Sequence, residues 1–295
     1  MRLLRWFLLF AVVVGVLLYW RTLPDPMEES ALAGLTGDPG HGQQVFLATG
    51  CASCHMAPGA TGDAQLLLSG GQEFPSAFGT FYAPNISQDP EQGIGDWSLL
   101  NLANAVMRGV GREGEHLYPA LPYASYNKMQ LQDVADLYAY MKTLPADSTP
   151  SRPHDVGFPF NQRIALGGWK LLFLSDAWTV GGTLQPEAEL GRYIAEAMAH
   201  CGECHTPRNA LGGMEKSRWL AGAPNPSGKG TIPNITPARL EWSEEEIASY
   251  LTTGMTPDYD SVGGHMAHVV DNFGKLPPDY AANVAAYLKA VPPAE

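Results

Sequence analysis

The sequence predicts an all-α protein in which two tandem domains follow an N-terminal transmembrane helix. Three observations lead to this prediction: an uncharged apolar run near the N-terminus, segments that recur at a nearly constant offset, and apolar residues at helical spacing. No window shows the sustained alternation of apolar and polar residues that is typical of half-buried strands. With 295 residues, the chain has the length of about two domains.

Composition and charge narrow the class of protein. Hydrophobic residues make up 45% of the chain, which is enough for a packed core. Acidic residues outnumber basic ones by 30 to 18, so the formal net charge is -12. A nucleic-acid partner would need a basic face, and this balance argues against one. The excess of acidic residues fits a protein partner with a basic or mixed docking surface. The alternative is that the negative charge serves only to keep the protein soluble.

The N-terminal apolar run is the candidate membrane anchor. Arg5 precedes and Arg21 follows the uncharged stretch, and a bilayer span usually takes ~17–25 residues. Residues 3–23 are long enough when both arginines reach to the interfaces, and Trp and Tyr lie where an interfacial belt would be. A cleaved signal sequence is the alternative, because residues 31–33 have the Ala-x-Ala form. In both cases we expect the rest of the chain to be exported.

All four cysteines belong to two Cys-x-x-Cys-His motifs, at residues 51–55 and 201–205. Two disulfides, a four-thiolate zinc site or redox-active cysteine pairs would also use four cysteines. None of these requires a histidine directly after the second cysteine, whereas covalent attachment of haem c does. Two cysteines three positions apart on a helical turn face the same way, so both can form thioethers to the vinyl groups of one haem.

The histidine that follows each cysteine pair is the expected proximal ligand of the haem iron. The motifs therefore predict two covalently bound haems c. The expected attachment and ligand residues are Cys51, Cys54 and His55 for the first haem and Cys201, Cys204 and His205 for the second.

An internal repeat supports this interpretation independently. The second motif begins 150 residues after the first, and other segments recur at nearly the same offset. We therefore expect two copies of one domain, a first repeat at residues 34–146 and a second repeat at 187–294, joined by a linker at 147–186. The other recurring pairs are Pro84-Asn85-Ile86-Ser87 with Pro233-Asn234-Ile235-Thr236, Trp97 with Trp242, and residues 139–145 with 286–292.

Helix signals place the same elements in each repeat. Ser98 and Ser243 are expected N-caps, and Glu246 completes a capping box with Ser243. Proline closes the last helix of each copy. The expected helices are 38–50, 98–110 and 130–143 in the first repeat and 190–200, 243–253 and 278–290 in the second.

The linker contains an apolar patch at residues 169–174. The patch is too short to span a bilayer. We expect it to pack between the two domains, and contact with the membrane or with a partner subunit is the alternative.

The second repeat offers a clear sixth iron ligand. Methionine in that position raises the reduction potential of an electron-transfer haem. Met266 precedes the last helix and is the expected ligand. Met255 follows a helix end too closely to lie freely over the haem, and His265 remains the alternative.

The first repeat leaves the sixth ligand open. Direct alignment places Leu121 near the position of Met266, and leucine cannot bind iron. Met129, at the start of the final helix, is the preferred replacement. His116 or an open five-coordinate iron are the alternatives, and Met107, in the middle of a helix, is interpreted as a core residue.

The recurring Pro-Asn-Ile segments suggest a polar role toward the haem. Asn85 and Asn234 would donate hydrogen bonds to partly buried haem propionates. Turn formation is the equally weighted alternative for both residues. Trp97 and Trp242 are interpreted as core residues rather than haem contacts.

Four stretches of the chain resemble the membrane-anchored cytochrome c subunits of periplasmic alcohol, gluconate and aldehyde dehydrogenases. The resemblance covers nearly all of residues 34–294 and implies two domains like class I cytochrome c with His–Met haems. It also implies a single-pass location in the bacterial inner membrane, with the haem domains on the periplasmic side. Leu121 departs from the family pattern, which often has methionine there. The stretches are 79–86, 117–123, 133–140 and 201–209.

Two classes of function are compatible with these features. The resemblance implies an electron carrier with no substrate of its own, which relays electrons from a dehydrogenase to quinone, another cytochrome or a terminal oxidase. The alternative is a diheme redox enzyme, similar to thiosulfate dehydrogenase or a peroxidase, that acts on a small molecule at the first haem. An enzyme of that kind needs an open or unusually ligated iron, and Leu121 keeps this alternative in place.

Overall fold

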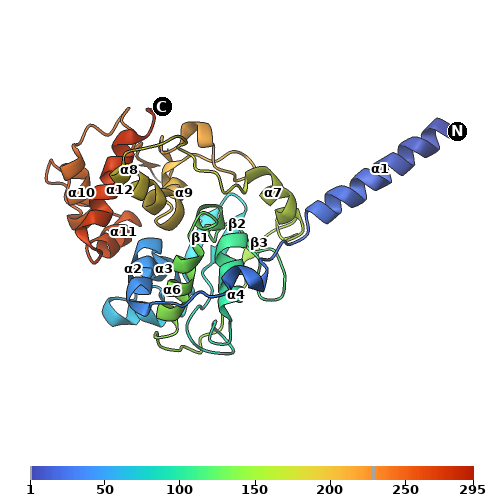
Figure 1. The fold of residues 1–295 in the computed structure, drawn as a ribbon, viewed down its shortest axis with the longest axis horizontal. Coiled ribbons are helices and arrows are strands. Elements are labelled where there is room, and N and C mark those ends of the chain that lie inside the picture. The colour runs from blue at the N-terminus through green and yellow to red at the C-terminus, as the bar shows by residue number, and fades with distance from the viewer. Residues whose placement is uncertain (1, 227–229) are drawn as a thin grey trace.

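The computed structural model describes residues 2–226 and 230–295. Helix α1 (Arg2–Arg21) extends away from the rest of the molecule, and none of its residues is buried (Figure 1). It has a mean hydropathy of 2.2 and is the one described helix that is long and apolar enough to cross a membrane. Its length and exposure are consistent with the expected anchor.

The rest of the structure is predominantly helical, as expected. Two segments wind as π-helices, Asn104–Arg108 and Tyr193–Met198. The α-helices of the first repeat are α2 (Pro39–Thr49), α3 (Cys51–His55), α4 (Leu99–Ala103), α5 (Tyr123–Tyr126) and α6 (Leu131–Met141). The later ones are α7 (Ala165–Phe173), α8 (Pro186–Arg192), α9 (Gly202–His205), α10 (Glu244–Thr253), α11 (Met266–Phe273) and α12 (Pro278–Ala290). Short 3₁₀ helices are η1 (Glu29–Leu32), η2 (Gly62–Leu67) and η5 (Lys216–Arg218).

Short strands are present that the sequence analysis did not predict. Strands β1 (Glu73–Ser76), β2 (Gly79–Tyr82) and β3 (Asp155–Val156) form one antiparallel sheet in that order. Strands β4 (Ala223–Pro224) and β5 (Thr231–Ile232) pair antiparallel in the second repeat. Strands of two to four residues are too short for alternation of apolar and polar residues to mark them. The prediction of an all-α chain is therefore corrected to a predominantly helical one.

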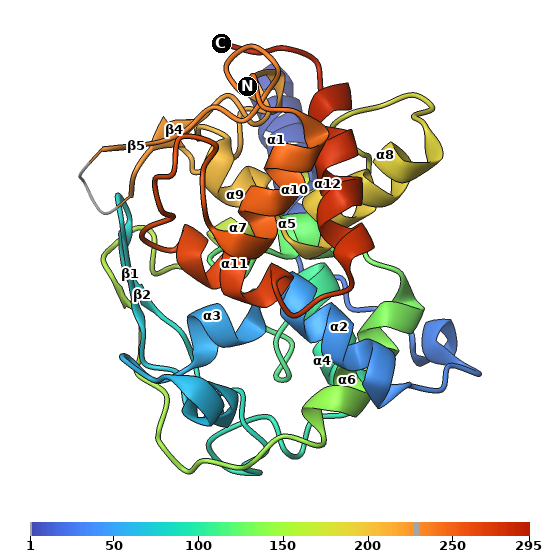
Figure 2. The same cartoon turned by 90° about the vertical axis from the view of Figure 1, so that its left-hand side faces the viewer.

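A close helix crossing recurs in the two repeats. Helix α2 packs against α6 and α8 packs against α12, so that the first helix of each repeat meets the last (Figure 2). A glycine lies at each contact. A Cβ on Gly42 would lie 1.9 Å from the carbonyl oxygen of Asp136, and a Cβ on Gly191 would lie 1.8 Å from that of Asn283. The backbones therefore approach as closely as only glycine permits.

One hydrophobic core extends through both repeats. The contiguous cluster includes Val45 and Met129 from the first repeat and Ile194 and Tyr287 from the second. Each of these side chains is at most 5% exposed. The two repeats therefore share buried surface instead of standing apart on the linker.

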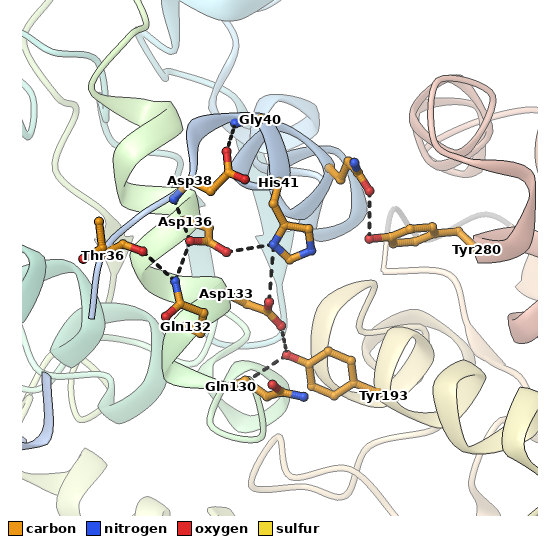
Figure 3. Close-up of polar contacts among 11 residues, drawn as sticks. Thr36, Asp38, Gly40, His41, Gln130, Gln132, Asp133, Asp136, Tyr193 and Tyr280 are labelled. Atoms are coloured by element: carbon orange, nitrogen blue, oxygen red, sulfur yellow. Dashed lines mark hydrogen bonds and ion pairs between the residues drawn. The ribbon is translucent and has the colours of Figure 1, made fainter. Parts of the chain in front are cut away.

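A polar network on α2 and α6 adds a contact between the repeats (Figure 3). Nδ1 of His41 lies 2.8 Å from Oδ2 of Asp136 and 3.7 Å from Oδ1 of Asp133. The Tyr193 hydroxyl, from the second repeat, donates to Asp133. Burial acts to raise the pKa of Asp136, but hydrogen bonds from the Asp38 amide and from neighbouring side chains lower it overall. The network thus holds a charged carboxylate between the helices and ties Asp133 to the other repeat.

The linker helix α7 packs on one side and is exposed on the other. The Trp169 indole donates to the carbonyl oxygen of Leu211 in the second repeat at 3.0 Å, while Lys170 donates to that of Gly109 in the first at 2.7 Å. The expected packing between the repeats is therefore present on this side. The opposite side leaves Leu171 and Leu172 exposed, at 55% and 68%.

Candidate haem-binding sites

The first Cys-x-x-Cys-His motif forms its own short helix. Gly50 ends α2 in the left-handed conformation (φ 65°) and starts α3, which turns the motif away from the axis of α2. Cys51 and Cys54 lie one helical turn apart, and the Thr49 hydroxyl lies 3.3 Å from the Cys51 sulfur. None of the four cysteines takes part in a disulfide. Both thiols of this motif are therefore available on one face of a helical turn.

His55 is oriented by a backbone carbonyl from the recurring Pro-Asn-Ile segment. Its Nδ1 lies 2.8 Å from the carbonyl oxygen of Pro84. Nδ1 must carry the proton in this contact, so Nε2 has a free lone pair. Burial lowers the pKa of His55, although the hydrogen bond to Pro84 partly opposes this. The imidazole is therefore neutral, which is the form that binds a metal.

The second motif repeats this geometry. Nδ1 of His205, at the end of α9, lies 2.8 Å from the carbonyl oxygen of Pro233. Burial lowers the pKa of His205 as well, with the Pro233 hydrogen bond opposing it. Each recurring proline thus supports the histidine of its own repeat, a role that the sequence analysis did not assign to Pro84 or Pro233. Their recurrence at the offset of the motifs was the signal for it.

Asn85 and Asn234 bond to backbone groups. The Asn85 amide donates to the carbonyl oxygens of Asp147 and Thr149 at 2.7 and 2.8 Å, and its oxygen accepts from the Ser87 amide. The Asn234 amide donates to the carbonyl oxygen of Ala294 at 2.7 Å. The Ser87 contact is local turn chemistry, whereas the contacts with Asp147, Thr149 and Ala294 join the Pro-Asn-Ile segments to distant parts of the chain. Both side-chain amides thus have backbone partners in the structure, and a contact of either asparagine with a haem propionate stays a prediction.

The candidate sixth ligands differ in their surroundings. Met129 is 5% exposed and belongs to the shared core, and Met266 begins α11 and packs partly buried against the same core. His116 is held elsewhere, because its Nε2 lies 2.8 Å from the carbonyl oxygen of Thr22, just after α1. Met255 is 45% exposed. Met107, 7% exposed, is a core residue as expected.

The two motifs lie close to each other. Burial raises the pKa of Cys54 to about 12, and the nearby thiols of Cys51 and Cys204 contribute to the rise. The Tyr126 hydroxyl donates to the carbonyl oxygen of Thr49 at 2.9 Å, and its ring meets that of His200 edge-on at 5.5 Å. Tyr126 therefore bridges Thr49, two residues before the first motif, and His200, directly before the second.

The residues present fit haem c at both places. Each site offers two thiols on one helical turn for thioether bonds and one neutral imidazole whose Nε2 is free for iron. A zinc site would use all four thiolates around one ion and leave this orientation of both histidines unexplained. Fold and donor set together define a c-type cytochrome.

Comparison with known proteins leads to the same class. A family model described as cytochrome c matches residues 40–145. The chain is 54% identical over 288 residues to a diheme cytochrome c-type protein of Cereibacter sphaeroides, with 98% of this chain and 97% of the relative covered. The chain belongs to this family of diheme c-type cytochromes.

More distant relatives are cytochrome subunits of dehydrogenases. The fructose dehydrogenase cytochrome subunit of Gluconobacter japonicus is 34% identical over 91% of this chain and 55% of the relative. The cytochrome c subunit of a quinone-dependent alcohol dehydrogenase of Gluconacetobacter polyoxogenes is 34% identical over 82% and 53%. The chain spans about half the length of these two subunits.

Proposed function

We propose that the protein transfers electrons at the periplasmic face of the bacterial inner membrane through two covalently bound haems. The observation that carries this proposal is the repeated site: two histidines, each with Nδ1 bound to a proline carbonyl, in motifs that lie close to each other. Haem iron supplies a one-electron couple between its ferric and ferrous states. Cysteine thioethers hold each macrocycle, the histidine ring is locked by its proline, and Tyr126 keeps the two motifs adjacent.

The proposed unit of this function is a domain like class I cytochrome c, present twice. Residues 34–146 and 187–294 form these domains, and residues 147–186 link them. The support is that the helices correspond in order and packing: α8 stands in the second repeat where α2 stands in the first, and α12 where α6 stands. Each repeat also has a short helix that carries its motif. The shared core then fixes the positions of the two haem sites relative to each other.

Met129 and Met266 are the proposed sixth ligands. The support for Met129 is its burial in the shared core, against which Cys51 of the first motif also packs, together with the engagement of His116 by the Thr22 carbonyl. Replacing either methionine by alanine is expected to remove about half of the weak charge-transfer band of methionine-ligated ferric haem. Absorption spectroscopy of the oxidised protein measures this, with Met107→Ala as the control that keeps the full band. An unchanged band in both variants would rule these ligands out.

Ligand binding separates the carrier from a diheme enzyme at the first haem. A carrier with both irons saturated is expected to be inert to cyanide and carbon monoxide. Rapid stoichiometric binding at one haem would favour the enzyme, because an open iron is what such chemistry requires. Because position 121 holds leucine instead of methionine, the first haem is where an open iron would bind these ligands.

A dehydrogenase subunit is the proposed electron donor, and quinone, another cytochrome or a terminal oxidase the acceptor. The support is that relatives at 34% identity are cytochrome subunits of fructose and alcohol dehydrogenases. Mild detergent extraction followed by identification of co-purifying proteins tests this pairing. Recovery of the cytochrome without any dehydrogenase subunit would argue against it.

Helix α1 is proposed as the membrane anchor, with α7 lying at the membrane surface beside it. Gly167 of α7 packs against the residue just after α1, since a Cβ there would lie 1.9 Å from the carbonyl oxygen of Thr22. Figure 1 shows α7 next to the end of α1. Five of the exposed large apolar side chains outside α1 belong to this part of the linker. They are Phe158, Phe160, Ile164, Leu171 and Leu172.

A spin label on α7 tests this placement in lipid nanodiscs. A Leu172→Cys variant has one free thiol, since the native cysteines are bound to haem. We expect its label to be more accessible to oxygen than to a water-soluble nickel complex, because apolar side chains at the interface enter the acyl region. Leu190→Cys on α8, at a residue 57% exposed, is the control and should show the opposite order. Equal behaviour of both labels would place α7 in water.

A further inference from the structure

The second repeat contains a fully buried carboxylate that the first repeat lacks. Glu196 precedes Cys201 by five residues, in the π-helical segment that leads into the motif, and its side chain is 0% exposed. The residue five positions before Cys51 is Phe46, which is 2% exposed. The same place in the two copies is thus occupied by an apolar ring in one and by a carboxylate in the other.

Every hydrogen-bond partner of the Glu196 carboxylate is a donor. Its Oε2 accepts from the Thr179 amide at 2.7 Å, and its Oε1 accepts from the Val180 amide at 3.0 Å and from the Tyr287 hydroxyl at 2.7 Å. A protonated carboxyl group would need an acceptor for its own hydrogen, so this arrangement is that of the ionised form. Burial and then the charge of Glu196 raise the pKa of Tyr287, which therefore keeps its proton and donates it.

No basic side chain in the described part of the chain forms an ion pair with this carboxylate. Among the described residues, no lysine, arginine or histidine nitrogen lies within 4.0 Å of the Glu196 carboxylate. The guanidinium of Arg192, one helical turn earlier, donates to the carbonyl oxygens of Val180 and Gly182 and pairs with Glu189. Lys128 contributes a more distant attraction and donates to the carbonyl oxygen of Ala124. The carboxylate is stabilised by hydrogen bonds and retains its negative charge.

Hydrogen bonds and packing connect the carboxylate to the second haem motif. The Tyr287 hydroxyl, which donates to Glu196, accepts from the Trp219 indole at 3.0 Å. The Trp219 ring lies on Gly202, the residue after Cys201, where a Cβ would come within 2.0 Å of it. Glu196 is also one cause of the raised pKa of Cys201, after burial and the neighbouring Cys204. In the first repeat, Tyr140 takes the place of Tyr287 and its ring packs on Phe46 at 5.2 Å.

We propose that the buried charge of Glu196 lowers the reduction potential of the second haem and thereby makes the two haems unequal. The proposal rests on the proposed function, in which the second motif holds a haem. Oxidised haem iron carries one more positive charge than reduced iron, and a nearby negative charge in a water-free interior stabilises the oxidised form. Charges near the metal ligands and burial of the site are known means of tuning the reduction potential of a metal site. With apolar Phe46 in the equivalent place, the first haem lacks this contribution.

A Glu196→Gln variant tests the proposal by removing the charge while keeping the size of the side chain. We expect the equilibrium constant for reduction of the second haem to rise about tenfold, which is a midpoint shift of about 59 mV for a one-electron couple. The first haem should keep its midpoint. Potentiometric titration of the full protein measures both, and a Cys51→Ser/Cys54→Ser background, with only the second haem attached, assigns the shifted wave.

Three variants separate charge from packing. Glu196→Asp keeps the charge and should stay near the wild-type midpoint, and Tyr287→Phe keeps the charge and should not reproduce the rise. Phe46→Leu, at the matched position of the first repeat, should leave the second haem unchanged. If Glu196→Gln does not fold with both haems, Glu196→Leu replaces it as a second variant without the charge.

The outcomes distinguish this proposal from the proposed function. An unchanged midpoint of the second haem in a neutral variant that carries both haems overturns the role of Glu196. An equal rise in Tyr287→Phe also overturns it, since packing would then explain the effect. If intact-mass measurement of the wild-type protein shows no haem on Cys201 and Cys204, the proposed function itself fails before any potential is compared.

Discussion

Replacing Cys51 and Cys54 together by serine is expected to leave a protein that carries one covalent haem instead of two. Serine keeps the size of the side chain but cannot form a thioether, and His55 alone holds a haem only by a reversible iron bond. The loss removes a large apolar group from the surroundings of Met129 and Tyr126, so we also expect lower stability. Intact-mass measurement and the pyridine haemochrome spectrum give the number of haems per chain.

A residue between the two cysteines provides the matched control. Ser53 lies on the same helical turn, and its hydroxyl accepts from the Asn272 amide at 3.2 Å. Ser53→Ala removes this contact between the repeats and leaves both thiols in place, so both haems should remain. Two covalent haems in the double serine variant would show that the first motif is not an attachment site.

Placing a methyl group on Gly191 is expected to destabilise the protein by about 3 kcal/mol, the upper range for overpacking in a core. The added Cβ would lie 1.8 Å from the carbonyl oxygen of Asn283, so α8 and α12 must separate. A loss of this size lowers the melting temperature by roughly 6–12 °C for a chain of this size. Thermal unfolding followed by circular dichroism measures the change in Gly191→Ala.

Substitutions at two other glycines serve as a matched case and a control for Gly191→Ala. Gly42→Ala places a Cβ 1.9 Å from the Asp136 carbonyl oxygen at the equivalent crossing of α2 and α6, and a similar loss is expected. Gly168 of α7 has nothing within 4 Å of an added Cβ. Gly168→Ala should therefore be neutral or slightly stabilising, because alanine has a higher helix propensity than glycine. Equal melting temperatures for Gly191→Ala and Gly168→Ala would contradict the close crossing.

Helices α4, α10 and α12 were predictable because their sequence signals are local. Ser98 and Ser243 cap α4 and α10 with the hydrogen bonds of a capping box, and α12 has the predicted bounds 278–290. Caps and apolar spacing act within a few residues of sequence, so a single chain reveals them. The π-helical turns Asn104–Arg108 and Tyr193–Met198 were not predictable, because the capping and periodicity signals do not distinguish π from α winding.

The orientation of the site residues depends on contacts between distant segments. The carbonyls of Pro84 and Pro233 bind histidines 29 and 28 positions away in sequence, and no local pattern fixes such a pair. For Asn85, the sequence could not separate a haem contact from turn formation, because a side-chain amide can form the hydrogen bonds of either role. The burial of Glu196 was not predictable from the sequence, because one acidic residue in a helical segment is usually a solvated surface residue. Only the fold shows that this side chain is buried.

The core that runs from Val45 to Tyr287 also restricts how the two copies can evolve. Two domains joined only by a linker could each drift, be exchanged with a paralogue or be lost without harm to the other. Here a substitution that reshapes the inner surface of one copy must be matched in its neighbour, so selection acts on the pair as one heritable unit. Recombination that swaps a single half between related genes should therefore yield misfolded chimaeras, even when both parents are functional.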